Sequence, residues 1–252
     1  MKKIFLLAGA MAMLVLGSCK KDKNSAGDNN GGKTKLLKKL TRTENGKTTV
    51  YNFTYDGNKL TSYSSSDNLE TTSFTFDGAG NITKLENKSN SYNSTYTFSY
   101  NNGIPVSGTT KVLHNIGSGQ ESVVQDDVLT YTVTNNQVSK IKEESKLDGT
   151  ITTANLTYTI NGNLEKLNIA GDEPFSVTFT YGTKKSGFPI VSKWVLDMGY
   201  TLRFSSKNET LTAFYDFPGT QFDETVNTKY TYDGDGYPLT SNDGDTQLTF
   251  EY

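Results

Sequence analysis

The chain has 252 residues, of which 34% are hydrophobic and 12% aromatic, and its formal net charge at pH 7 is −2. This length fits one large β domain or two small ones. The charge shows no basic excess, which argues against nucleic acid as a partner. The single cysteine excludes an intrachain disulfide, so packing must stabilise the fold. Glycine is plentiful and proline scarce, which suits strands joined by tight turns.

The first 18 residues have the order of a bacterial lipoprotein leader. Lys2 and Lys3 precede an apolar stretch over residues 4–16, which is too short for a transmembrane helix. Leu16-Gly17-Ser18-Cys19 then resembles a lipobox. The resemblance implies cleavage before Cys19 and its lipidation, and several acyl chains anchor stably. We expect a signal peptide over 1–18 and a mature chain anchored at Cys19 in the bacterial cell envelope, at the outer membrane. An ordinary signal peptide with an incidental cysteine is the alternative.

Residues 19–34 are polar and rich in glycine and asparagine, without hydrophobic periodicity. This composition predicts a flexible tether from the lipidated cysteine, and a sorting signal is the second interpretation. Residues 35–252 are predicted to form a single domain built from repeated β-hairpins.

The hairpins are indicated by forward strands with apolar residues two apart, followed by turns such as Asp56-Gly57-Asn58. Alternation at period two puts the apolar residues on one face and Thr, Ser or Asn on the other. Asp-Gly and Asn-Gly are strong hairpin signals. The predicted forward strands carry Tyr51/Phe53/Tyr55, Thr72/Phe74/Phe76, Tyr96/Phe98/Tyr100, Leu129/Tyr131/Val133, Leu156/Tyr158/Ile160, Phe175/Val177/Phe179/Tyr181, Tyr200/Leu202/Phe204 and Leu248/Phe250/Tyr252.

The return strands show a different spacing. Their apolar residues are three apart, as in Leu60/Tyr63 and Ile82/Leu85. A flat strand cannot place both on one face, so the spacing predicts a β-bulge or sharp twist in each return strand.

Three turns resemble the YD repeats of bacterial cell-surface proteins: Tyr55-Asp56-Gly57, Phe76-Asp77-Gly78 and Tyr232-Asp233-Gly234. Together with the lipobox, the chain resembles a family of Bacteroidetes lipoproteins of unknown function with a porin-like fold, one member of which is described as lipid-binding. The resemblance implies an all-β, antiparallel up-and-down meander that closes into a large or flattened barrel. It brings no catalytic residues, and the middle repeats lack the Tyr-Asp pair.

Counting the runs gives sixteen to eighteen strands. The aromatic face could point inward or, as in a transmembrane barrel, toward lipid. Lysines in the return strands (Lys84, Lys140, Lys166) favour the inward direction, whereas the alternating Leu248/Phe250/Tyr252 favours the outward one. A round barrel of this size would enclose a channel, so we expect either a flattened barrel or a lined lumen. The candidate apolar lining is Phe53, Phe74, Phe98, Tyr131, Tyr158 and Phe179.

Candidate catalytic and metal-binding residues are few. His114 is the only histidine and lies in the 106–121 insertion, where a surface loop is expected. Asp233-Gly234-Asp235-Gly236 and Asn242-Asp243-Gly244-Asp245 resemble calcium loops but fall where hairpin turns are due. No catalytic site, metal site or cofactor is expected.

Two further patterns have a structural and a functional interpretation. The carboxylate pairs Asp126-Asp127, Glu143-Glu144 and Asp172-Glu173 could suggest a glycosidase, but neighbours on a strand face opposite ways, so solvated charge is expected. Trp194 could stack on a sugar, but core packing is expected.

The expected function is therefore non-catalytic binding of an apolar or amphipathic, lipid-like ligand inside the barrel. A surface module that binds glycans or proteins, and a purely structural envelope component, are the alternatives.

Overall fold

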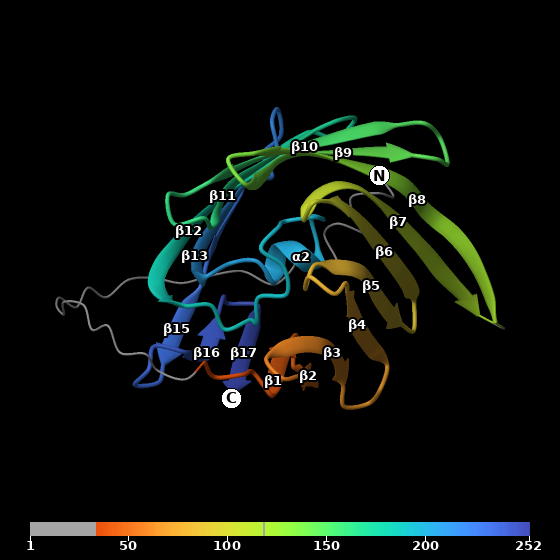
Figure 1. Ribbon diagram of the computed structural model, residues 1–252. Helices are drawn as coiled ribbons and strands as arrows, with labels where there is room; N and C mark the ends of the chain where they lie inside the picture. Colours follow the sequence, from red (N-terminus) through yellow and green to blue (C-terminus); the bar gives the residue numbers. More distant parts are fainter. Residues whose placement is uncertain (1–33, 118) are drawn as a thin grey trace.

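Seventeen strands form one sheet in the computed structural model, which describes residues 34–117 and 119–252 (Figure 1). The predicted signal peptide, Cys19 and all of the predicted tether except residue 34 lie outside these residues. The strands are β1 Lys39–Glu44, β2 Lys47–Asp56, β3 Lys59–Ser65, β4 Glu70–Phe76, β5 Ile82–Ser89, β6 Tyr92–Asn101, β7 Ile104–Gly117, β8 Gln120–Thr134, β9 Gln137–Ser145, β10 Ile151–Tyr158, β11 Leu164–Ala170, β12 Phe175–Lys185, β13 Asn208–Asp216, β14 Glu224–Asn227, β15 Lys229–Tyr232, β16 Pro238–Asn242 and β17 Thr246–Glu251.

The sheet is an antiparallel meander that returns to its start. Each strand from β1 to β13 pairs with the next, and Leu40 of β1 lies between Tyr51 of β2 and Phe250 of β17. β13 pairs with β14 and β15 pairs with β16, with Thr228 alone separating β14 from β15. The predicted all-β meander, its strand number and its closure into a nearly closed barrel are confirmed.

The turns and bulges follow the sequence signals. Asn45 and Gly46, between β1 and β2, both have positive φ, as a type I′ turn requires. The register of β2 on β3 shifts between Thr54 and Tyr55, and the same shift recurs in the later hairpins. Because of this shift, Leu60 and Tyr63 are both buried, so the bulges predicted from the spacing of three are confirmed.

A hydrogen bond of one kind recurs five times between a forward strand and the chain segment before it. A tyrosine hydroxyl near the end of a forward strand donates to a backbone carbonyl 17 to 20 residues earlier in the chain. The pairs are Tyr55 to Leu37, Tyr100 to Ile82, Tyr158 to Val138, Tyr181 to Leu164 and Tyr230 to Thr210, at 2.7–3.1 Å. These tyrosines therefore join neighbouring strands of successive hairpins, and among the YD-like turns Tyr55 is the one that makes this bond.

The 106–121 insertion is a strand extension, which corrects the expectation of a surface loop. It forms the outer part of the β7–β8 hairpin, where His114 pairs with Ser122. The His114 ring stacks on Tyr92 at 4.9 Å between centroids. β-Branched residues are frequent over 104–116 (Ile104, Val106, Thr109, Thr110, Val112 and Ile116), a strand signal that the unusual length of the hairpin obscured.

The connection between β12 and β13 enters the barrel, and we call residues 186–207 the plug. It contains α2 (Tyr200–Arg203), which Figure 1 shows enclosed by the ring of strands. The prediction of a forward strand through Tyr200, Leu202 and Phe204 is therefore wrong. A short helix with its neighbouring turns lets these apolar side chains contact several walls at once, which an added wall strand could not do.

The plug occupies the interior of the barrel. The sequence had predicted either a flattened barrel or an open lumen there. Phe204 is 2% exposed, and its ring lies 5.9 Å from Tyr63 and 5.7 Å from Phe74. Trp194 is also 2% exposed, so the expected core packing is confirmed. The Tyr131 hydroxyl donates to the plug carbonyl of Leu196 at 2.8 Å. The aromatic face of the sheet points inward, as predicted, and packs on the plug.

Candidate functional site

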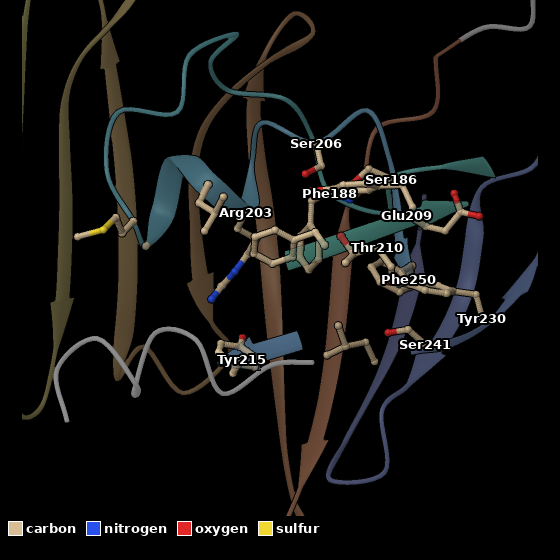
Figure 2. A pocket seen from close by; sticks show the side chains of 17 residues that line it. Ser186, Phe188, Arg203, Ser206, Glu209, Thr210, Tyr215, Tyr230, Ser241 and Phe250 are labelled. Carbon is tan, nitrogen blue, oxygen red and sulfur yellow. Dashed lines mark hydrogen bonds between the residues drawn. The ribbon is translucent and has the colours of Figure 1, made fainter. Parts of the chain in front are cut away.

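A cavity of about 110 Å³ lies between the plug and the wall made by β12, β13 and β15 to β17 (Figure 2). Both the wall and the plug contribute side chains. The lining consists of Phe179, Tyr181, Ser186, Gly187, Phe188, Met198, Gly199, Leu202, Arg203, Ser206, Glu209, Thr210, Tyr215, Tyr230, Ser241, Leu248 and Phe250.

Aromatic rings form the firmest part of the cavity wall. Phe188 meets Phe250 edge to face at 5.8 Å. Gly187 allows this approach, because a Cβ there would lie 2.5 Å from the Phe250 ring. With Leu202 and Leu248, these rings give the cavity an apolar body that suits a hydrocarbon group.

Glu209 supplies the acidic group of the cavity lining. Its side chain is packed across Gly182, and the residue is 4% exposed. Oε1 accepts a hydrogen bond from the Tyr232 hydroxyl at 3.1 Å, while Oε2 has no hydrogen-bond partner in the described chain. Burial raises the pKa of Glu209. Arg203 lines the cavity at a different point (Figure 2), so the lining combines an apolar body with a few polar groups.

The six predicted lining residues have different positions. Phe179 lines the cavity. Phe74, Phe98 and Tyr131 are buried in the core, and Phe53 and Tyr158 are partly buried against it. The cavity also uses plug residues that the sequence analysis did not select, such as Phe188 and Leu202. The sequence between Tyr181 and Tyr200 has no clear hairpin turn. This absence could have indicated that β12 is followed by a long connection rather than by a hairpin.

A pair of inward-facing carboxyl groups corrects the expectation of solvated charge. Asp127 of β8 is 6% exposed, and the Gln125 amide donates to it at 2.7 Å and to Glu143 of β9 at 3.0 Å. Burial and the neighbouring Asp127 raise the pKa of Glu143 to about 8. In both adjacent pairs, one carboxylate faces inward and the other outward, as expected from the alternation of a strand. The two inward members, Asp127 on β8 and Glu143 on β9, are diagonal neighbours across the two strands.

The outer members of these pairs and the third pair are solvated, as expected. Glu144 is exposed and pairs with Lys142 at 2.7 Å, Asp126 pairs with Lys146 at 2.7 Å, and Asp172 and Glu173 are exposed in a turn. Another buried carboxyl group, that of Asp197, lies in the plug. It accepts hydrogen bonds from the backbone of Tyr200 at 2.6 Å and from the Thr201 hydroxyl at 2.7 Å, and so shapes the turn into α2.

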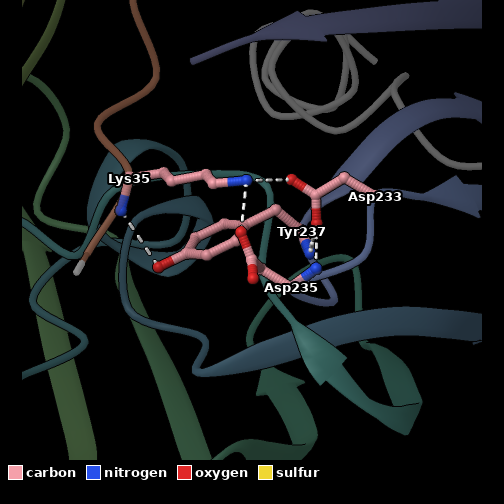
Figure 3. Close-up of polar contacts among 4 residues, drawn as sticks. All are labelled: Lys35, Asp233, Asp235 and Tyr237. Atoms are coloured by element: carbon pink, nitrogen blue, oxygen red, sulfur yellow. Dashed lines mark hydrogen bonds and ion pairs between the residues drawn. The ribbon is translucent and has the colours of Figure 1, made fainter. Parts of the chain in front are cut away.

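The calcium-like sequences form hairpin turns. Residues 233–237 join β15 to β16, and residues 243–245 join β16 to β17. Asp233 and Asp235 bind the Lys35 ammonium group at 2.7 and 2.6 Å, as Figure 3 shows. Among the described residues, no group of three or more His, Cys, Asp or Glu side chains could hold a metal ion. The same residues include no helix that is long and apolar enough to span a membrane.

Comparison with solved structures finds the same fold in two porin-like proteins. One, from Bacteroides vulgatus ATCC 8482, has a TM-score of 0.56 and 14% identity over 86% of this chain and 98% of its own. The other, from Bacteroides uniformis ATCC 8492, has a TM-score of 0.53 and 15% identity over 85% and 96%. No protein-family model and no curated protein matches the sequence. At these low sequence identities, the comparison shows that the chain shares the porin-like barrel fold of these two proteins.

Proposed function

We propose that this chain is a non-catalytic binding protein of the bacterial cell envelope, anchored through Cys19, that takes an apolar or amphipathic ligand between the plug and the barrel wall. The observation that carries the proposal is the cavity, with Phe188, Leu202, Leu248 and Phe250 around its body and Glu209 among its polar groups. Such a lining binds hydrocarbon and orients a polar end.

The cavity volume limits what part of a ligand enters. An apolar cavity of about 150 Å³ binds benzene. The cavity here, at about 110 Å³, suits a single ring or a short hydrocarbon end, while the remainder of a longer amphipathic molecule lies outside. This narrows the lipid-like ligand expected from the sequence to one that inserts only its apolar end.

Toluene is the simplest probe of the cavity. We expect saturating toluene to raise the melting temperature, because a ligand at tenfold excess over its Kd adds about 1.4 kcal/mol to the free energy of unfolding. For a domain of this size, that corresponds to a rise of roughly 3–6 °C. Ser241→Leu and Ser206→Leu place a larger side chain at the cavity and should abolish the rise. Ser91→Leu, in the exposed β5–β6 turn, is the matched control and should retain it. An unchanged melting temperature in the parent protein would exclude the cavity as a binding site.

Anchoring through Cys19 has its own test. Cys19→Ala is expected to move the protein from the membrane fraction into the soluble fraction after a high-salt wash, because loss of the acyl chains removes the stable anchor. Immunoblotting of the two fractions measures the change. Ser18→Ala keeps a small residue before the cysteine and should leave the protein in the membrane fraction. Retention of Cys19→Ala in the washed membranes would contradict anchoring at this residue.

A further inference from the structure

The two ends of the barrel differ in the sign of their exposed charge. We call the end at which the described chain enters the sheet the entry end. Because the strands alternate in direction, the entry end also carries the β2–β3, β10–β11 and β15–β16 turns and both ends of the plug. Lys35, just before β1, is held there by Asp233 and Asp235 (Figure 3).

Exposed lysines surround the entry end, and we call them the basic rim: Lys38, Lys59, Lys184, Lys185 and Lys207. None of them forms an ion pair with a carboxylate of the described chain. Aromatic rings hold two of them in place, since Lys59 Nζ lies 4.8 Å from the Phe76 centroid and Lys185 Nζ lies 4.0 Å from that of Tyr237. Lys207 donates to the Asn161 carbonyl in the β10–β11 turn at 3.0 Å.

Most carboxylates at the entry end already have protein partners. Asp233 and Asp235 bind Lys35, Glu251 binds Lys39 at 2.6 Å, and Asp77 accepts the backbone N–H groups of its own turn. Asp56 is exposed next to Lys59. The basic rim therefore presents more positive than negative charge to a partner.

The opposite end of the barrel is acidic. Its turns and strand ends expose Asp67, Asp148, Asp172, Glu173, Asp223, Glu224 and Asp245. Charges of opposite sign at the two ends orient a molecule in the field of an anionic surface, with the basic end toward it.

An apolar side chain stands among the basic residues. Ile160, in the β10–β11 turn, is fully exposed and precedes Asn161, whose carbonyl holds Lys207. Basic residues around an exposed aliphatic side chain are the combination by which peripheral proteins bind the headgroup region of a bilayer.

We propose that the entry end is a docking surface for an anionic lipid bilayer, with the basic rim on the phosphate groups and Ile160 in the headgroup layer. The chain emerges at this end, so docking here and a tether to the same bilayer are compatible. The inference goes beyond the proposed function and needs neither ligand binding in the cavity nor acylation.

The test uses the full chain carrying Cys19→Ser, which has no lipid attachment site. Its binding to vesicles of equimolar phosphatidylglycerol and phosphatidylcholine is compared, by co-sedimentation at low salt, with binding to phosphatidylcholine alone. The rim variant Lys59→Gln/Lys184→Gln/Lys185→Gln/Lys207→Gln should bind the anionic vesicles about tenfold more weakly or worse. The control variant Lys47→Gln/Lys88→Gln/Lys111→Gln/Lys229→Gln loses the same charge from exposed positions away from the rim and should bind like the parent.

Ile160→Ser should also weaken binding to the anionic vesicles, whereas Ile151→Ser, at the acidic end and 50% exposed, should not. Equal losses in the rim and control variants would show a response to net charge alone and overturn the proposal, as would a parent that prefers neither vesicle. Because thermal unfolding reports toluene binding separately, failure here leaves the cavity proposal standing, and failure of the cavity leaves this one standing.

Discussion

Phe204→Ala is expected to lower the free energy of unfolding by about 3–5 kcal/mol, the range found when a buried aromatic residue is truncated. Phe204 joins the plug to two wall strands, since its ring centroid lies within 6 Å of Tyr63 in β3 and Phe74 in β4, and it also packs on Phe188 within the plug. The truncation leaves a hole at the point where plug and wall meet. Urea unfolding, followed by tryptophan fluorescence from the buried Trp194, measures the loss.

Phe222→Ala is the matched control for this prediction. Phe222 is 72% exposed in the β13–β14 loop, so its truncation should change the free energy of unfolding by less than about 0.5 kcal/mol. If Phe204→Ala were as mild as the control, the plug would not be an integral part of the core. Unfolding of the plug at a lower urea concentration than the barrel would likewise contradict a single cooperative core.

Glu143→Gln is expected to stabilise the protein at pH 8 by an amount on the order of 4 kcal/mol, and to have little effect near pH 5. The pKa of Glu143 is raised from 4.5 to about 8 in the folded chain, chiefly by burial and then by Asp127. The folded state therefore keeps a proton that the unfolded chain has lost between these pH values. Wild-type stability should fall as pH rises through this window, and glutamine, which does not ionise, removes that fall.

Urea unfolding of both proteins between about pH 4 and about pH 9 measures the difference, and this range covers the ordinary carboxyl pKa and the raised one. Glu144→Gln, on the next residue, is the control, because that side chain is exposed and pairs with Lys142. It should leave the pH profile unchanged. A wild-type profile that is flat across the window would show that the pKa of Glu143 is not raised in the fold.

The sequence predicted those features of the fold that depend on residues close together in the chain. Asp-Gly and Asn-Gly turns, alternating aromatics and the spacing of Leu60 and Tyr63 each depend on a few neighbouring residues, and they predicted the hairpins, the bulges and the inward face. The path of residues 186–207 depends instead on the shape of the space inside the closed ring. Tyr200, Leu202 and Phe204 alternate just as strand residues do, so period two alone could not show that they lie on a helix within the barrel.

The candidate site was less predictable for the same reason. Phe179 was selected because it belongs to the repeat, whereas Phe188 and Phe250 meet only because the plug turns back toward β17. The pairing of Asp127 with Glu143 likewise arises from the diagonal register of β8 on β9. Contacts between strands or segments decide both features, and no periodicity within one strand carries that information.

The tyrosine bonds between successive hairpins bear on how the barrel is assembled. Each hydroxyl needs a carbonyl that an earlier hairpin has already positioned, and β17 must finally reach β1, which is formed from the first described residues. A nascent chain can therefore join successive hairpins in the order of synthesis, but it cannot complete the ring until β17 has been made and has paired with β1.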